Sequence, residues 1–128
     1  MSYCFSKTVA MSYDDAISKV TAELQREGFG ILTEIDVKDK LKEKINVVFR
    51  KYKILGACNP AYAYKALQVE PNIGTMLPCN VVVQELETGE IVVSAIDPLA
   101  SMMAIKNEAL GVIAKEIQAK LKKAIDSI

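Results

Sequence analysis

The chain has 128 residues, of which 51% are hydrophobic and 25% charged, a composition typical of one globular domain. Basic and acidic residues balance at 16 each, which argues against nucleic-acid binding because such proteins carry a basic face. Histidine is absent, so histidine-based triads, general bases and metal sites are excluded. The sequence contains neither an apolar run of about 20 residues nor a signal-peptide pattern, so we expect a cytoplasmic protein without a membrane segment.

Hydrophobic periodicity predicts a strand, a helix and a second strand in the first part of the chain. Weak alternation indicates a strand over residues 3–9. Ser12, followed three residues later by Asp15, resembles a capping box and predicts a helix that ends at Gly28. Strict alternation over residues 31–37 predicts a half-buried strand with Ile31 and Ile35 on one face.

Cap residues and prolines mark the elements in the middle of the chain. Asp36 is expected to cap a short polar helix over residues 37–45, and a strand follows over residues 52–58. Asn59 is expected to cap a helix over residues 60–69, with Pro60 at the first helical position.

The last part of the sequence predicts a hairpin and a long helix. Strands over residues 79–86 and 91–96 flank a turn at residues 87–90. Asp97-Pro98 repeats the signature of a cap followed by proline, and an apolar stripe with lysines opposite then extends to Ile128.

This order of elements predicts an α+β fold: a single, mostly antiparallel sheet covered on one face by two long helices. No linker or repeat divides the chain, so residues 1–128 are expected to form a single domain. The other face of the sheet must be solvated, covered by a partner or shaped into a pocket. The strands around Val82 and Val92 are too apolar on both sides for a wet face, which favours a homodimer.

Two Cys-Asn pairs stand at the ends of apolar strands: Cys58-Asn59, followed by Pro60, and Cys79-Asn80. Such positions join rigid elements to loops, where functional residues are common. If the two strands are neighbours, the pairs converge on one place. Cys58 also precedes a predicted helix N-terminus, whose dipole favours a thiolate.

The chain closely resembles the DUF302 family of bacterial and archaeal proteins over nearly its whole length. The resemblance is carried by residues 28–29, 34–38, 52–60, 66–67, 73–74, 77–83 and 97–98. It implies a β-α-β(4)-α arrangement with a layout similar to TATA-binding-protein-like folds, and it implies a dimer, but it brings no established activity. The positions that it carries over are Cys58, Asn59, Pro60, Cys79 and Asn80, with Asp97 and Pro98 at the last helix.

Several interpretations of these residues remain open. Buried cysteine commonly acts as a small apolar residue, Asn59 as a cap, and Asn80 as a partner of a buried loop carbonyl. Alternatively, Cys58 and Cys79 form a reversible disulfide or a two-coordinate site for a soft metal such as Cu(I). Met102-Met103 suggests a binding motif for a soft metal, although a methionine in a helical connection more often packs in the hydrophobic core.

Two functions follow as hypotheses. The first is a small-ligand-binding or interaction module with its site near Cys58-Asn59-Pro60 and Cys79-Asn80. The alternative is a cytosolic thiol-redox or soft-metal protein, handling Cu(I), that uses Cys58 and Cys79. The expected partners are a second copy of the chain and a small molecule or soft metal, with neither nucleic acid nor membrane. The sequence identifies no catalytic residue, cofactor or reaction.

Overall fold

The computed structural model describes residues 2–128 and contains five strands and several helices. The strands are β1 (Cys4–Val9), β2 (Gly30–Asp36), β3 (Tyr52–Cys58), β4 (Cys79–Glu85) and β5 (Ile91–Ile96). The helices are α1 (Tyr13–Arg26), α2 (Val37–Ile45), α3 (Pro60–Val69), the 3₁₀ helix η1 (Pro71–Met76), α4 (Pro98–Met102) and α5 (Glu108–Asp126).

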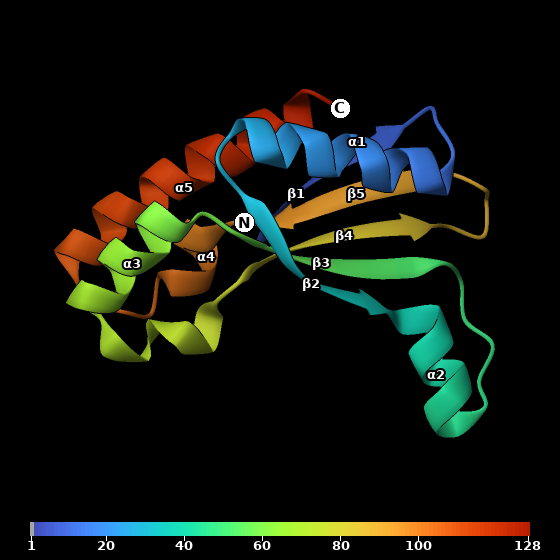
Figure 1. Ribbon diagram of the computed structural model, residues 1–128, viewed down its shortest axis with the longest axis horizontal. Helices are drawn as coiled ribbons and strands as arrows, with labels where there is room; N and C mark the ends of the chain where they lie inside the picture. The colour runs from blue at the N-terminus through green and yellow to red at the C-terminus, as the bar shows by residue number, and fades with distance from the viewer. Residues whose placement is uncertain (1) are drawn as a thin grey trace.

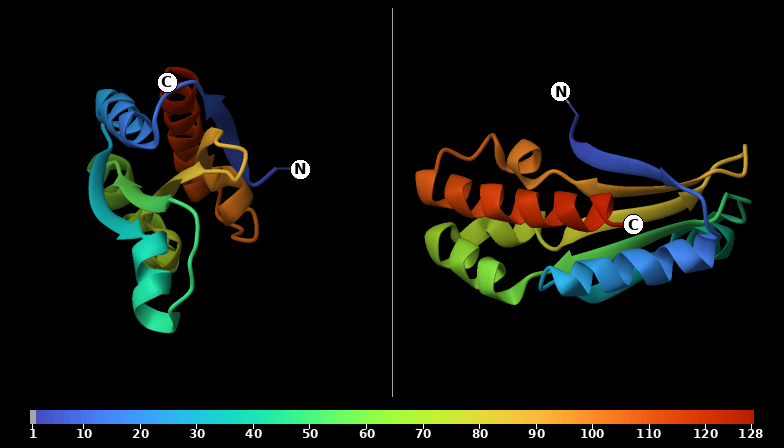
Figure 2. Two further views of the ribbon diagram at one scale, coloured as in Figure 1. Left: turned by 90° about the vertical axis from the view of Figure 1, so that its right-hand side faces the viewer. Right: turned by 90° about the horizontal axis from the view of Figure 1, so that it is seen from above.

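The strands form one sheet in the order β1-β5-β4-β3-β2, and every neighbouring pair is antiparallel. The helices α1 and α5 lie along one face of this sheet (Figures 1 and 2). This arrangement confirms the predicted α+β fold, an open antiparallel sheet with helices on one face. The short helices α2, α3 and α4 are additions within that layout.

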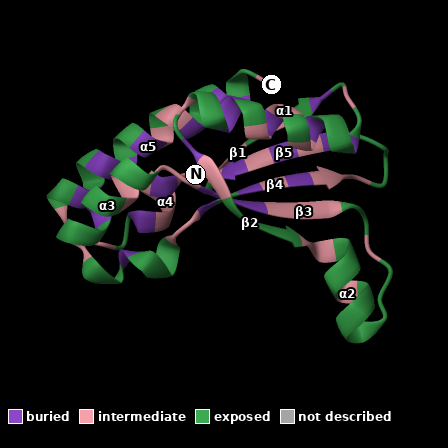
Figure 3. Ribbon diagram, viewed as in Figure 1, coloured by how far each residue is buried: buried purple, intermediate pink, exposed green. Residues whose placement is uncertain are grey.

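The core lies between the sheet and the two long helices. Buried and more exposed positions alternate along the central strands (Figure 3). Val81 and Val93 are fully buried, so they face inward between more exposed neighbours. From the helices, Val20, Leu24 and Leu121 are fully buried against this layer. Each such side chain contributes about 1.5–3 kcal/mol of transfer free energy when it leaves water.

Most predicted helix starts are confirmed by cap hydrogen bonds. The Ser12 side chain accepts from the backbone N–H of Asp15 at 3.1 Å, and Asp36 accepts from that of Asp39 at 3.0 Å. Asp97 accepts from the backbone N–H of Leu99 at 3.0 Å and starts α4. These bonds satisfy backbone donors that the first turn of a helix leaves free.

The prediction of a regular half-buried strand at β2 is wrong in one respect. The pairing with β3 shifts between Ile31 and Thr33, so an extra residue, Leu32, is inserted there. Because of this bulge, Ile31 packs against the core while Ile35 is exposed. The sequence pattern places both side chains on one face, since strict alternation contains no bulge.

The face of the sheet opposite α1 and α5 carries residues that are exposed or half-buried, among them Asn80, Val82 and Gln84 on β4. The helix α2 projects from the β2 edge, away from α1 and α5, and buries none of its residues (Figures 1 and 3). Beyond it, Val48 is 82% exposed. This face and α2 therefore present apolar surface that the described chain leaves uncovered.

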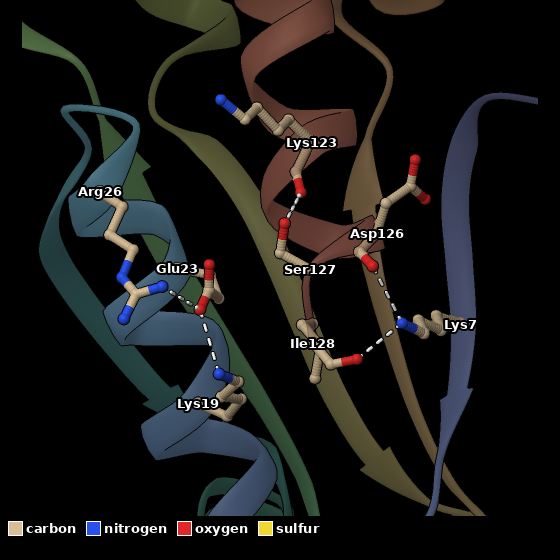
Figure 4. A network of polar contacts seen from close by, with 8 residues as sticks. All are labelled: Lys7, Lys19, Glu23, Arg26, Lys123, Asp126, Ser127 and Ile128. Carbon is tan, nitrogen blue, oxygen red and sulfur yellow. Dashed lines mark hydrogen bonds and ion pairs between the residues drawn. The ribbon is translucent and has the colours of Figure 1, made fainter.

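Hydrogen bonds from β1 hold the C-terminal end of α5. The Nζ atom of Lys7 on β1 donates to the carbonyl oxygens of Asp126 and Ile128, at 3.1 and 2.6 Å (Figure 4). These oxygens lie at a helix C-terminus, where the macrodipole favours a cation.

Within residues 2–128, none of the helices is long and apolar enough to cross a membrane.

Candidate functional site

The antiparallel pairing of β3 with β4 brings the two Cys-Asn segments together. Ala57 pairs with Cys79 and Gly56 with Asn80, so Cys58 lies one residue beyond the Cys79 partner. Directly opposed residues in such a pair have Cα atoms about 4.5–5.5 Å apart. The two strands are therefore neighbours, which is the condition for the two Cys-Asn pairs to converge.

Cys58 and Cys79 line one cavity, although alternation along a strand turns neighbouring side chains to opposite faces. Cys58 is the last residue of β3, just before the chain turns into α3, so its side chain does not follow the alternation of the strand and lines the cavity as well. The cavity lies where the end of β3 and the start of β4 meet α3, α4 and α5. Apart from Asn59, its lining consists of apolar and sulfur-containing residues.

The cavity is small. Its free volume is about 10 Å³, about the space that one water molecule needs. Large side chains such as Phe29, Leu110 and Ile117 line the cavity and occupy the rest of the space between the strands and the helices. An organic ligand of ordinary size requires a cavity of roughly 300 Å³ or more. The space beside the cysteines therefore accommodates a species of about one atom.

Both thiols are held in the neutral form. Burial raises the pKa of Cys79 to about 11, and the nearby Cys58 adds to the shift. Burial also raises the pKa of Cys58, so the predicted stabilisation of its thiolate by the α3 N-terminus is outweighed. Within the described residues 2–128, Cys4, Cys58 and Cys79 are all free and form no disulfide.

Asn59 and Pro60 occupy the predicted helix start, but Asn59 does not cap it. No side-chain bond from Asn59 reaches the first turn of α3, where Pro60 is the first residue. Instead, its Nδ2 atom donates to the backbone oxygen of Glu27, 3.2 Å away. Glu27 is the C-cap of α1, and helix ends leave carbonyl groups in need of donors.

Asn80 lies apart from the cysteine cavity. It follows the buried Cys79 on β4, so its side chain is on the opposite face of the sheet, where it is exposed. There it lines two shallow hollows together with Ile96, with volumes of about 200 and 240 Å³. The alternative role of Asn80 as a partner of a buried loop carbonyl is therefore wrong, because the side chain faces solvent.

One sulfur-containing residue of the cavity comes from a distant part of the chain. Met102, the last residue of α4, is buried and lines the same cavity as the two thiols. The Met102-Met103 pair signalled soft-metal chemistry in the sequence, but nothing in the sequence placed it beside Cys58. Among residues 2–128, no three cysteine, aspartate or glutamate side chains form a cluster able to hold a metal ion.

A protein-family comparison identifies the family of this chain. The family model described as a domain of unknown function, DUF302, matches residues 5–128. The chain belongs to the DUF302 family. The resemblance to this family is thereby confirmed.

One solved structure similar to this DUF302 chain is described as an uncharacterised conserved protein DUF302 from Bacillus stearothermophilus. It superposes with a TM-score of 0.92 at 28% sequence identity, over 99% of this chain and 98% of the other. No curated protein is significantly similar to this DUF302 chain. The family and this relative thus establish the fold without assigning an activity.

Proposed function

We propose that this DUF302 protein binds a single soft metal ion of the Cu(I) class between Cys58 and Cys79. The observation that carries the proposal is the convergence of two thiols, from neighbouring strands, on one apolar cavity about the size of an atom. Thiolates are the ligands that select Cu(I). An apolar lining with few competing polar groups supports this preference.

The chemistry of binding is a proton exchange without a redox change. Cu(I) displaces one proton from each thiol, two Cu–S bonds form, and two protons leave to solvent. Because burial raises the pKa of both thiols, the metal must supply the free energy of their deprotonation. We therefore expect apparent affinity to rise about a hundredfold per pH unit below those pKa values.

The geometry favours a metal over the other functions considered for these cysteines. A small organic molecule does not fit a free volume of about 10 Å³. A thiol-redox role requires a reactive thiolate, whereas burial raises the pKa of Cys58 and Cys79. Metal binding needs no free thiolate beforehand, since the ion itself displaces the protons.

Anaerobic titration of the reduced protein against a chromophoric Cu(I) chelator tests the proposal. We expect one Cu(I) per chain, and loss of that binding in both Cys58→Ser and Cys79→Ser. Cys4→Ser is the matched control, because Cys4 lies on β1, separated from β3 by two strands, and should bind as wild type does. Retention of Cu(I) by the two site variants, or its loss in Cys4→Ser, would contradict the proposal.

We further propose that the uncovered face of the sheet forms a homodimer. Ile54, Val82 and Val92 are half-buried there, and Ile35 is exposed. A two-fold interface places the same patch of both copies together, so uncharged residues meet without repulsion. The exposed apolar residues around α2 adjoin this face and support the same assembly.

Analytical ultracentrifugation tests the dimer with two matched variants. Val82→Lys places a charge in the middle of the proposed interface and should give a folded monomer. Val112→Lys places the same charge on α5, where Val112 is 62% exposed, and should remain a dimer. A wild-type monomer at micromolar concentration, or dimers in both variants, would contradict the assembly.

Free cysteines also support a cellular location. Reducing compartments keep thiols unpaired, so the three free cysteines support the cytoplasm as the compartment in which this chain works. Cu(I) is also the copper oxidation state that thiol ligands favour. Separating cell extracts into cytoplasmic and envelope fractions tests the location, and enrichment in the envelope would contradict it.

A further inference from the structure

Three sulfur-containing side chains from three separate elements line the cavity: Cys58 from β3, Cys79 from β4 and Met102 from α4. Met102 is buried, whereas its neighbour Met103 is 67% exposed. The two methionines are therefore not equivalent. Of the two, Met102 alone lies where it can contact a species bound by the thiols.

We propose that Met102 supplies the third ligand of the metal site and makes it selective for Cu(I) over Zn²⁺. This inference rests on the proposed function, since it assigns a ligand within the same cavity. A thioether is a soft, uncharged donor that suits Cu(I), whereas Zn²⁺ prefers thiolate, imidazole and carboxylate ligands. Cys58, Cys79 and Met102 together give a three-coordinate, all-sulfur site.

The charge of the site agrees with a neutral third ligand. Two thiolates and Cu(I) carry one net negative charge, and a third thiolate would add another inside an apolar cavity. Burying unpaired charge is costly, and the lining contains no basic residue to offset it. Met102 adds a metal bond without adding charge.

Hydrogen bonds fix the helix that carries Met102. The Asp97 carboxylate accepts from the backbone N–H of Leu99 at 3.0 Å and from the Nε2 atom of Gln118 on α5 at 3.1 Å. These bonds anchor the start of α4 to the long helix that forms one wall of the cavity. Met102 is thus held beside the thiols before any ligand arrives.

Met102→Leu tests the inference, with Met103→Leu as the matched control. Leucine keeps the volume and apolar character of methionine, so both variants should fold. We expect Met102→Leu to lower Cu(I) affinity by about tenfold or more, a range known for groups that tune metal sites. Zn²⁺ affinity should not change, and Met103→Leu should match wild type in both measurements.

X-ray absorption spectroscopy of the Cu(I)-loaded proteins gives the second readout. We expect three sulfur neighbours in wild type and Met103→Leu, and two in Met102→Leu. Wild-type protein that binds Cu(I) with two sulfur neighbours and no affinity loss in Met102→Leu would overturn this inference while leaving the two-cysteine site intact. Wild-type protein that binds no Cu(I) would overturn both proposals.

Discussion

The Nδ2 atom of Asn59 donates a hydrogen bond to the backbone oxygen of Glu27, 3.2 Å away and 32 residues earlier in the chain. This bond ties the junction of β3 and α3 to the end of α1. Gly28, which follows Glu27, has a φ of +88°, and a Cβ there would lie 3.0 Å from the Asn59 Nδ2 atom. The cysteine cavity therefore borders a junction held by a donor amide and a glycine.

Asn59→Asp separates this bridging role from a capping role. Aspartate caps helices as well as asparagine does, but its carboxylate has no hydrogen to donate to the Glu27 oxygen. We expect Asn59→Asp and Asn59→Ala to lower the free energy of unfolding by about 1 kcal/mol each or more, as measured by urea denaturation. Aspartate at full wild-type stability would indicate that capping, not bridging, is what Asn59 contributes.

Gly56 on β3 has no room for a side chain. A Cβ at this position would collide with the Thr33 hydroxyl and lie 2.8 Å from the Pro78 Cγ atom. We expect Gly56→Ala to lower the free energy of unfolding by about 2 kcal/mol, because the Thr33 hydroxyl and the Pro78 ring must shift to make room for the Cβ. Adding Thr33→Ala should restore part of that loss, since it removes the nearer obstacle.

Gly111 provides the control for the glycine experiment. It lies on the exposed side of α5, and a Cβ there meets no atom within 4 Å. Gly111→Ala should raise the free energy of unfolding by up to about 1 kcal/mol, because alanine favours the helix. Equal effects of the two substitutions would mean that packing at Gly56 is not the cause.

Local sequence signals were sufficient for much of the fold. The caps Ser12, Asp36 and Asp97 each bond a donor two or three residues later, so spacing along the chain predicts them. The same reasoning misassigned Asn59, because its acceptor on Glu27 is distant in sequence. The residue types Asn59 and Pro60 therefore predicted the start of α3 correctly, but the hydrogen-bond partner of Asn59 incorrectly.

The candidate site was predictable only in part for a similar reason. Strand pairing brings Cys58 and Cys79 together, whereas the sequence predicted their convergence only on the condition that the two strands are neighbours. The position of Met102 beside the thiols depends on how α4 packs against the rest of the fold. The position of Asn80 on the opposite face of the sheet depends on the register in which β3 pairs with β4. The bulge at Leu32 likewise has no sequence signal in a regular alternating pattern.

Stability should fall at alkaline pH. Burial raises the pKa of Cys79 from 9.0 to about 11, and burial with nearby acidic groups raises that of Tyr13 from 10.0 to about 12. Both groups lose their protons more readily in the unfolded chain, so their contribution is complete below the unfolded pKa. It is lost as pH rises from 9.0 to about 11 for Cys79 and from 10.0 to about 12 for Tyr13.

Urea denaturation of the reduced protein across this alkaline range measures the effect. Cys79→Ala removes one of the two groups, so its stability should decline less steeply than that of wild type between pH 9.0 and about 11. Cys4→Ala controls for removal of a thiol in general. Parallel curves for Cys79→Ala and wild type would show that the buried thiol does not couple folding to pH.

Glu23 is a buried carboxylate, 5% exposed, that pairs with two cations of its own helix. Its Oε1 atom lies 3.1 Å from Lys19 Nζ and 3.2 Å from Arg26 Nη1 (Figure 4). Either cation alone compensates the charge, so we expect Lys19→Met and Arg26→Met each to cost less than about 1 kcal/mol. The double variant leaves the carboxylate unpaired and should cost about 2–3 kcal/mol, more than the sum of the two. Glu23→Gln in that background should restore stability, because it removes the uncompensated charge, and an additive double variant without this rescue would contradict the argument.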